Sequence, residues 1–288
     1  MDARTAQRIH QSVDQADLVL IGASNGLDMA EGLNVFSPDA HFVRTYGDLA
    51  AQTGARSILE GMALAQGDPA RAWAWVARFV RAEHLDYQPG PVLRPLRAIT
   101  RGKDCFVITC NVDGRFERAG FDPAFVLETE GSAQQARCPH GCPGAQRSIT
   151  DVAARLNASI AGGRVDEALL PRCPACGAVL VSGIDERRLA RRDAACDERL
   201  RALSGLLDAH RDDNVVVLEL GVGLRNGAIK RMLRSAVAGM ARLTYVVCNY
   251  NQAVVPQGLE DACVVVDGDM AQAFGLIADA RTAQSALE

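Results

Sequence analysis

Five short and nearly uninterrupted apolar segments lie along the chain, separated by longer stretches in which apolar residues recur at helical spacing. The short segments are rich in β-branched residues, as expected for strands covered on both faces. The stretches between them include residues 186–210 and 225–241. This alternation predicts an α/β fold with a Rossmann-type, doubly wound parallel sheet. The predicted strands read ADLVLIGAS, KDCFVITCNVD, NVVVLELGVG, LTYVVCNY and DACVVVDGD.

Two regions interrupt the alternation. Residues 36–96 contain RAWAWVARFVRAEHLDY and are predicted to form a helical insertion, with Trp73, Trp75 and Phe79 in a core. Residues 131–183 hold paired cysteines but little apolar periodicity. A small segment without a core of its own needs another source of stability, and a bound metal is the expected one. The predicted domains are a Rossmann-like domain of residues 1–130 and 184–288, which carries the insertion, and a small zinc-binding module of residues 131–183.

The cysteines divide into two groups. Cys138 and Cys142 lie in CPHGC, and Cys173 and Cys176 lie in CPACG. Four thiolates in two tight pairs predict a tetrahedral Zn²⁺ site that is structural, because four protein ligands leave no open position for catalysis. His140 is an alternative ligand inside the first pair. The remaining cysteines are expected to act mainly as small buried apolar side chains: Cys105, Cys110, Cys196, Cys248 and Cys263.

Composition narrows the classes of partner. The 288 residues are 48% hydrophobic, which is ample for a core, and the net charge of −4 gives no general attraction to nucleic acid or anionic lipid. The polar N-terminal stretch MDARTAQRIHQSVDQAD lacks an apolar segment of the signal-peptide kind, and no apolar run approaches the roughly 20 residues of a membrane span. We therefore expect a cytoplasmic protein with no nucleic-acid or membrane partner.

Glycine-rich and polar segments follow three of the predicted strands. LIGASNGLDMAEGL, residues 20–33, does not fit the GxGxxG pattern and is either a plain turn or a phosphate-binding loop. ITCNVDG supplies Asn111 and Asp113, and LELGVG supplies a second glycine turn at Gly221 to Gly223. Each could be ordinary turn chemistry. Because a doubly wound sheet binds its ligand at the carboxyl ends of its strands, their joint presence predicts a nucleotide site there.

The order of these motifs resembles the sirtuin family. The Gly-Ala turn after the first strand, the TCNVDGRFERAG run, the LETEGS segment, the cysteine pairs, the second glycine turn and a strand ending in Asn follow one another as in that family. The resemblance spans nearly the whole chain. It implies NAD⁺ bound in a cleft between a Rossmann domain and a smaller zinc domain.

The resemblance also implies roles for individual residues. The NAD⁺ phosphates would be faced by the first loop, Asn111 would hold the nicotinamide ribose and a water, and Asp113 would accept from the carboxamide. The second glycine turn would line the distal nucleotide, Asn249 would reach the adenosine ribose, and Asp269 would lie near adenine. The implied loop residues are Gly22, Ala23 and Ser24 in the first turn and Gly221, Val222 and Gly223 in the second.

Several departures from the usual sirtuin pattern suggest a different reaction. The first turn reads GAS, the Pro-Asp-Phe-Arg segment is missing, Cys110 replaces a glutamine, and Glu130 stands where deacylating sirtuins carry their histidine. This combination resembles the macrodomain-linked, class M sirtuins, which share the NVD and LELGVG motifs. That resemblance implies ADP-ribosyl transfer to an acceptor protein, in known cases a lipoylated carrier protein, and suggests a macrodomain partner.

Glu130 is the residue on which the choice of reaction depends. Deacylation needs a base that activates a ribose hydroxyl; histidine suits this task better than an unperturbed glutamate. A carboxylate can instead stabilise positive charge as nicotinamide leaves, or orient an acceptor. The leading prediction is therefore an NAD⁺-dependent protein ADP-ribosyltransferase with Asn111, Asp113 and Glu130 as catalytic residues. The alternatives are a protein-lysine deacylase, or an NAD⁺ or ADP-ribose sensor or NADase, and Glu130 could also be merely solvated.

Overall fold

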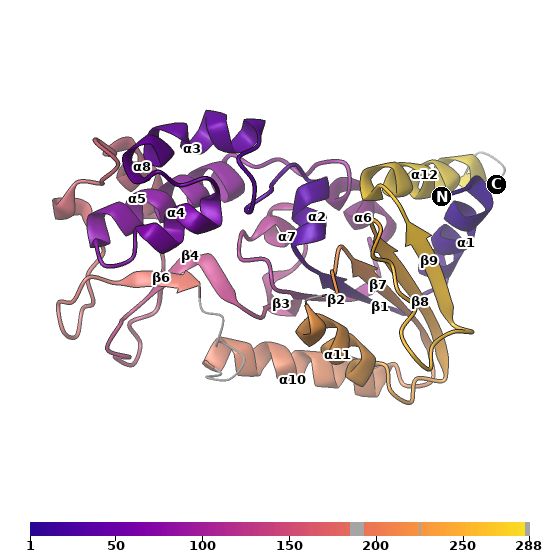
Figure 1. The fold of residues 1–288 in the computed structure, drawn as a ribbon. Helices are drawn as coiled ribbons and strands as arrows, with labels where there is room; N and C mark the ends of the chain where they lie inside the picture. The colour runs from indigo at the N-terminus through magenta and orange to yellow at the C-terminus, as the bar shows by residue number, and fades with distance from the viewer. Residues whose placement is uncertain (185–192, 225, 286–288) are drawn as a thin grey trace.

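The computed structural model describes residues 1–184, 193–224 and 226–285. Its larger sheet has six parallel strands in the order β3-β2-β1-β7-β8-β9. The predicted doubly wound α/β fold is therefore confirmed (Figure 1). The strands are β1 (Leu18–Ala23), β2 (Asp104–Thr109), β3 (Val126–Glu128), β7 (Asn214–Leu220), β8 (Arg242–Asn249) and β9 (Cys263–Asp267).

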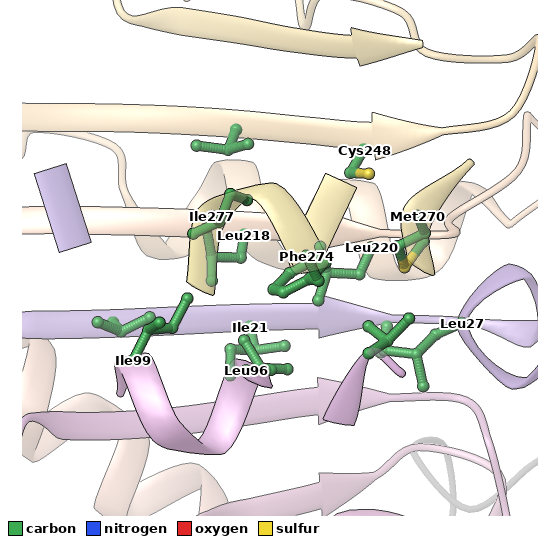
Figure 2. Close-up of a cluster of buried hydrophobic side chains, with 14 of the residues drawn as sticks. Ile21, Leu27, Leu96, Ile99, Leu218, Leu220, Cys248, Met270, Phe274 and Ile277 are labelled. Atoms are coloured by element: carbon green, nitrogen blue, oxygen red, sulfur yellow. The ribbon is translucent and has the colours of Figure 1, made fainter. Parts of the chain in front are cut away.

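Helices cover both faces of this sheet. On one face lie α1 (Ala3–Asp14), α6 (Leu93–Ile99) and α12 (Met270–Ser285). Figure 2 shows the core beneath them, where Phe274 and Ile277 lie close to Leu218 and Leu220. The other face packs against α10 (Ala194–Ala209) and α11 (Gly227–Ala236). The predicted helical stretches overlap these last two helices, but residues 186–192 and 225 of those stretches lie outside the described residues.

A second unit joins the helical insertion to the cysteine-rich segment. Buried residues of both segments form one hydrophobic cluster, and Trp73 Nε1 donates to the Leu180 carbonyl at 2.8 Å. Trp73, Trp75 and Phe79 are buried there, as predicted. The elements are α3 (Ala40–Thr53), α4 (Ile58–Leu64), α5 (Pro69–Val80), a π-helical turn η1 (Arg81–Leu85), α8 (Thr150–Ala158) and the antiparallel strands β5 (Arg147–Ser148), β4 (Gly131–Arg137) and β6 (Val181–Ile184).

Short elements lie between the larger ones. They are α2 (Asn25–Ala30) after β1, α7 (Arg115–Arg118) and the 3₁₀ turn η2 (Pro123–Phe125) between β2 and β3, and the 3₁₀ turn η3 (Glu167–Leu169) within the cysteine-rich segment. In Figure 1 the helical unit and the larger sheet lie side by side, with α2 and α7 between them. Within the described ranges, the helices are all too short or too polar to cross a bilayer.

Candidate functional site

The strand order places a topological switch point between β1 and β7. Successive strands run outward from β1 in one direction and from β7 in the other, so the loops after these two neighbours diverge. The two loops touch: Gly26 N donates to Gly221 O at 3.1 Å. A Cβ on Gly221, which has φ +62°, would lie 2.3 Å from Leu27 N, and one on Gly26 would lie 2.6 Å from Gly221 Cα. The glycines therefore permit a backbone contact that no other residue allows.

The first two residues of the predicted phosphate loop still belong to β1. Gly22 faces α11, and a Cβ there would lie 2.3 Å from Leu233 Cδ1. Ala23 is fully buried in the core on the opposite face. Helix packing thus accounts for both small residues, and their contact with phosphate stays a prediction.

Hydrogen bonds join the ends of β1 and β2. Asn111 Nδ2 donates to Ser24 O at 3.3 Å and to Asp28 Oδ1 at 2.8 Å, while Asn111 N donates to Thr109 Oγ1 at 3.0 Å. Both amide hydrogens of the side chain are therefore used inside the protein. Asn111 Oδ1 already accepts from the Cys110 thiol, whose sulfur lies 3.8 Å away, and its second lone pair remains for a ligand.

Ser24 and Cys110 are linked through the start of α11. Asn226 Oδ1 accepts from Ile229 N at 3.5 Å as the helix N-cap, which directs its Nδ2 to Ser24 Oγ at 3.3 Å and Cys110 Sγ at 2.9 Å. Cys110 Sγ lies 3.2 Å from Ser24 Oγ. Burial raises the pKa of the Cys110 thiol to about 11, and the nearby charge of Glu130 acts in the same direction. Cys110 is therefore a neutral thiol that holds the loops together.

A buried group of charges lies beyond Asn111. Arg115 Nη2 is 2.8 Å from Glu83 Oε2, Arg115 Nε is 3.6 Å from Asp113 Oδ2, and all three side chains are at most 4% exposed. Glu83 also accepts from Tyr46 Oη at 2.8 Å and lies 2.7 Å from His41 Nε2. Arg115 Nη1 is buried and has no hydrogen-bond partner among the described residues. Such a cluster is costly to bury, which marks it as a candidate functional feature.

The loop carrying Asp113 is fixed by its backbone as well. Gln134 Nε2 donates to Asp113 O at 2.7 Å, and His84 Nδ1 lies 3.2 Å from the same oxygen. Gly114 has φ +70°, and a Cβ on it would lie 2.7 Å from His84 Nδ1 and 2.8 Å from Gln134 Oε1. Only glycine fits this turn, which passes between the π-helical turn and β4.

Glu130 lies in the turn between β3 and β4, at the same carboxyl edge as Asn111. The turn is tied to β2 because Thr129 N donates to Thr109 O at 2.7 Å. Glu130 is half-buried. Burial is the main cause of the raised pKa of the Cys110 thiol, and the charge of Glu130 raises that pKa further. The structure therefore brings Glu130 to the edge that holds Ser24 and Asn111.

The predicted distal residues lie further along this edge. Val222 is buried in the hydrophobic cluster on the α10 and α11 face of the sheet, and its carbonyl accepts from Asn249 Nδ2 at 3.1 Å. Gly223 lies beside Gln252. Asp269 caps α12 through Gln272 N at 3.0 Å, so its carboxylate already has a structural task. The structure thus links Asn249 to the second glycine turn, whereas the hydrogen bond described for Asp269 stays within its own helix.

A cavity of about 440 Å³ opens at the carboxyl ends of β2 and β3. Asn111, Asp113 and Arg115 line one part of it, and Ser132 and Gln134 of β4 line another. The α10 residues Ala194 and Arg199 also border it. The cavity thus lies between the larger sheet and the small antiparallel sheet, with the buried charges at its wall.

The four paired cysteines converge as predicted. Cys138, Cys142, Cys173 and Cys176 place their sulfurs within 4.8 Å of one another. Sulfurs bound tetrahedrally to Zn²⁺ at ~2.3 Å would lie about 3.8 Å apart. Hydrogen bonds from the amides of Cys142 and His140 lower the pKa of the Cys138 thiol to about 6, which favours the thiolate that zinc needs. His140 Nδ1 lies 3.6 Å from Cys176 Sγ, beside this cluster.

Comparison with known proteins identifies one relative over most of the chain and another over less than half of it. A protein ADP-ribosyltransferase of Staphylococcus aureus is 22% identical over 274 residues, which cover 94% of this chain and 86% of that protein. NAD-dependent protein deacylase 1 of Pseudomonas aeruginosa is 34% identical over 118 residues, or 41% of this chain and 43% of that protein. No family model matches.

Solved structures share the fold. A Sir2 homologue in complex with NAD superposes with a TM-score of 0.58 and 16% identity, covering 96% of this chain and 94% of that one. A mutant Sir2 homologue in complex with ADP-ribose also gives a TM-score of 0.58 at 16% identity, covering 99% and 98%. The architecture described above is therefore that of the Sir2 structures.

Proposed function

We propose that this chain, whose relatives and structural neighbours support a place in the sirtuin (Sir2) family, is an NAD⁺-dependent enzyme that transfers ADP-ribose to a protein. The observation that carries the proposal is the match to a protein ADP-ribosyltransferase over 94% of the chain. The match to a deacylase covers 41% of the chain and makes lysine deacylation the second candidate.

The carboxyl edge of the larger sheet suits a dinucleotide. The Gly26–Gly221 contact holds the two turns together at this edge, where a doubly wound sheet binds its nucleotide. Asn111 Oδ1 keeps one lone pair after its contact with the Cys110 thiol, and Asp113 Oδ2 accepts no hydrogen bond from an N–H group of the described residues. These groups match the hydroxyl and carboxamide donors of NAD⁺. We assign the first turn and Ser24 to the phosphates, and the turn from Gly221 with Asn249 and Asp269 to the adenosine half.

NAD⁺, when bound, supplies the ADP-ribosyl group and nicotinamide as the leaving group. In this proposal Asn111 Oδ1 orients the ribose next to nicotinamide, and Asp113 orients the carboxamide. The walls of the cavity exclude water, which would otherwise compete with the acceptor. Positive charge develops on the ribose as nicotinamide leaves, so a carboxylate at the same edge lowers the barrier.

Glu130 is the residue we assign to that carboxylate. It follows β3, beside the strand β2 that precedes Asn111, and lies near the Cys110 thiol. An ionised glutamate stabilises developing positive charge and can receive the proton of an acceptor. It is a weaker base than histidine for activating a ribose hydroxyl, the step that deacylation requires. Glu130 thus supports transfer over deacylation.

The sequence motifs support a proposal for the subtype and for the acceptor protein. The NVD and LELGVG motifs resemble those of class M sirtuins, and we propose that subtype for this chain. The acceptor would then be a lipoylated carrier protein, with a macrodomain protein as partner. Zinc held by the four cysteines would stabilise the second unit and take no part in the chemistry.

Separation of products tests the proposal. The purified protein is incubated with NAD⁺ labelled in the adenosine half, together with a lysate or a lipoylated carrier protein. Label bound covalently to protein, with release of nicotinamide, is the expected result. Release of O-acyl-ADP-ribose from an acylated peptide would favour the deacylase, and free ADP-ribose alone would favour an NADase.

A further inference from the structure

Asp28 is a buried acidic residue of the first glycine-rich segment, and the sequence assigned it no role. It lies on α2, four residues after Ser24, and is only 4% exposed. Its Oδ1 accepts from Asn111 Nδ2 at 2.8 Å. The carboxyl group of Asp113 is its other close polar neighbour. Asp28 thus touches two residues of the predicted site without lining the cavity described above.

The charges around Asp28 do not allow a further anion. Asp113 accepts from Arg115 N at 3.0 Å through Oδ1, and Arg115 also pairs with Glu83. One buried guanidinium therefore already serves two carboxylates, with His41 as the only additional cation near Glu83 that the described contacts provide. A third buried carboxylate without a counter-ion would be strongly destabilising, so it takes up a proton instead.

We propose that Asp28 is a positioning residue that acts as a neutral carboxylic acid: its carbonyl oxygen accepts from Asn111, and its hydroxyl donates to the Asp113 carboxylate. This hydrogen bond supplies the donor that Asp113 Oδ2 otherwise lacks among the described residues. Asp28 thereby directs the Asn111 amide and the Asp113 carboxylate together. The consequence for catalysis rests on the proposed function.

The electrostatic surroundings agree with this placement of the proton. Burial raises the pKa of Asp28 well above its ordinary value, and the charge of Asp113 raises it further; Glu83 adds to the rise and Arg115 opposes it. Burial also raises the pKa of Asp113, but the charge of Arg115, the hydrogen bond from the Arg115 backbone N–H and the hydrogen bond from Asp28 oppose the rise. The pair therefore keeps its shared proton on Asp28.

Two substitutions separate the neutral form from the ionised one. Asp28→Asn retains one carbonyl acceptor and one N–H donor, so it reproduces both hydrogen bonds without a titrating proton. Asp28→Ala removes both. We expect nicotinamide release by Asp28→Asn to stay within about threefold of wild type, whereas Asp28→Ala loses about 10²-fold in kcat, because the site residues shift. Equal losses in the two variants would overturn the proposal.

The pH profile gives a second readout. Wild-type activity should fall as pH rises through the folded-state pKa of Asp28, because the ionised form repels Asp113. The Asp28→Asn profile should lack this fall. Identical alkaline limbs in the two profiles would contradict the proposal.

Unfolding without NAD⁺ distinguishes this inference from the proposed function. Because the folded pKa of Asp28 is raised, its favourable contribution is complete below the unfolded pKa of about 3.9 and is lost as pH rises through the folded pKa. The stability of Asp28→Asn relative to wild type should therefore increase with pH. If the stabilities of wild type and Asp28→Asn change with pH in parallel, the inference is wrong even if the enzyme is active. Diverging profiles in a protein that neither binds nor cleaves NAD⁺ would support Asp28 and refute the proposed function.

Discussion

The close contact between the two glycine turns predicts what a substitution in either turn would cost. This cost can be separated into a steric part and a part that comes from a positive φ. Gly26→Ala introduces a Cβ 2.6 Å from Gly221 Cα with no penalty from a positive φ. Gly239→Ala is the matched control, because Gly239 has φ +85° and nothing within 4 Å of its Cβ position. Gly221→Ala combines both effects, with φ +62° and a Cβ 2.3 Å from Leu27 N.

The magnitudes follow from these geometries. The left-handed conformation costs a residue with a Cβ about 1–2 kcal/mol, so Gly239→Ala should lose that much unfolding free energy. Overpacking a tight contact costs about 1–3 kcal/mol, which is the loss expected for Gly26→Ala. Gly221→Ala should lose about 2–5 kcal/mol, since it carries both penalties. The backbone clash cannot be relieved by a flexible side chain, so the loops themselves must move apart.

Urea unfolding and NAD⁺ titration calorimetry together check this reasoning. We expect Gly26→Ala and Gly221→Ala to bind NAD⁺ at least about tenfold more weakly, which corresponds to roughly 1.4 kcal/mol. Gly239→Ala should bind like wild type despite its lower stability. If Gly26→Ala unfolds and binds like wild type, the close approach of the two turns does not exist. If all three variants lose affinity equally, stability and not loop geometry controls binding.

Three further predictions concern other parts of the account. Cys176→Ser should lower the bound zinc measured by atomic absorption from one equivalent and expose the second unit to protease, whereas Cys263→Ser should do neither. Glu130→Ala should lose ADP-ribosyl transfer, and Glu130→His should gain the ability to remove acyl groups from lysine. If the wild type deacylates efficiently and Glu130→Ala deacylates equally well, Glu130 does not have the proposed role. Burial alone would raise the pKa of Glu83, but the hydrogen bond and charge of His41, together with Arg115, hold it below its usual value. Glu83 should therefore stabilise the fold above pH ~4.3, the pKa of glutamate in the unfolded chain. This contribution to the free energy of unfolding should be lost as pH falls through the folded-state pKa. In unfolding experiments, Glu83→Gln should lack this loss at acid pH.

The sequence predicted much of the larger sheet because its strands are buried on both faces. Five continuous apolar runs correspond to β1, β2, β7, β8 and β9. The run VLE of β3 is only three residues long, and so carries no usable periodicity. The shared core of the insertion and the cysteine-rich segment also escaped prediction. It depends on contacts between residues about 100 positions apart, such as Trp73 with Leu180.

The candidate site, like the fold, could be predicted from the sequence only in part. Strand ends have a local signature, so the sequence alone predicts that Ser24, Asn111 and Asp113 lie at one edge of the sheet. Asp28 and Glu83 lie within helical segments, where an acidic residue ordinarily faces solvent. Their burial results from the approach of Asn111 and Arg115, which are distant in sequence. Buried charge partners of this kind have no local signature.

The most direct test of the central claim is the ratio of nicotinamide released to ADP-ribose bound covalently to an acceptor protein, measured by mass spectrometry after incubation with NAD⁺. Our account predicts a ratio near one with the authentic acceptor, and loss of both products in Asn111→Ala. Nicotinamide release matched by O-acyl-ADP-ribose, with no ADP-ribose on protein, would contradict it.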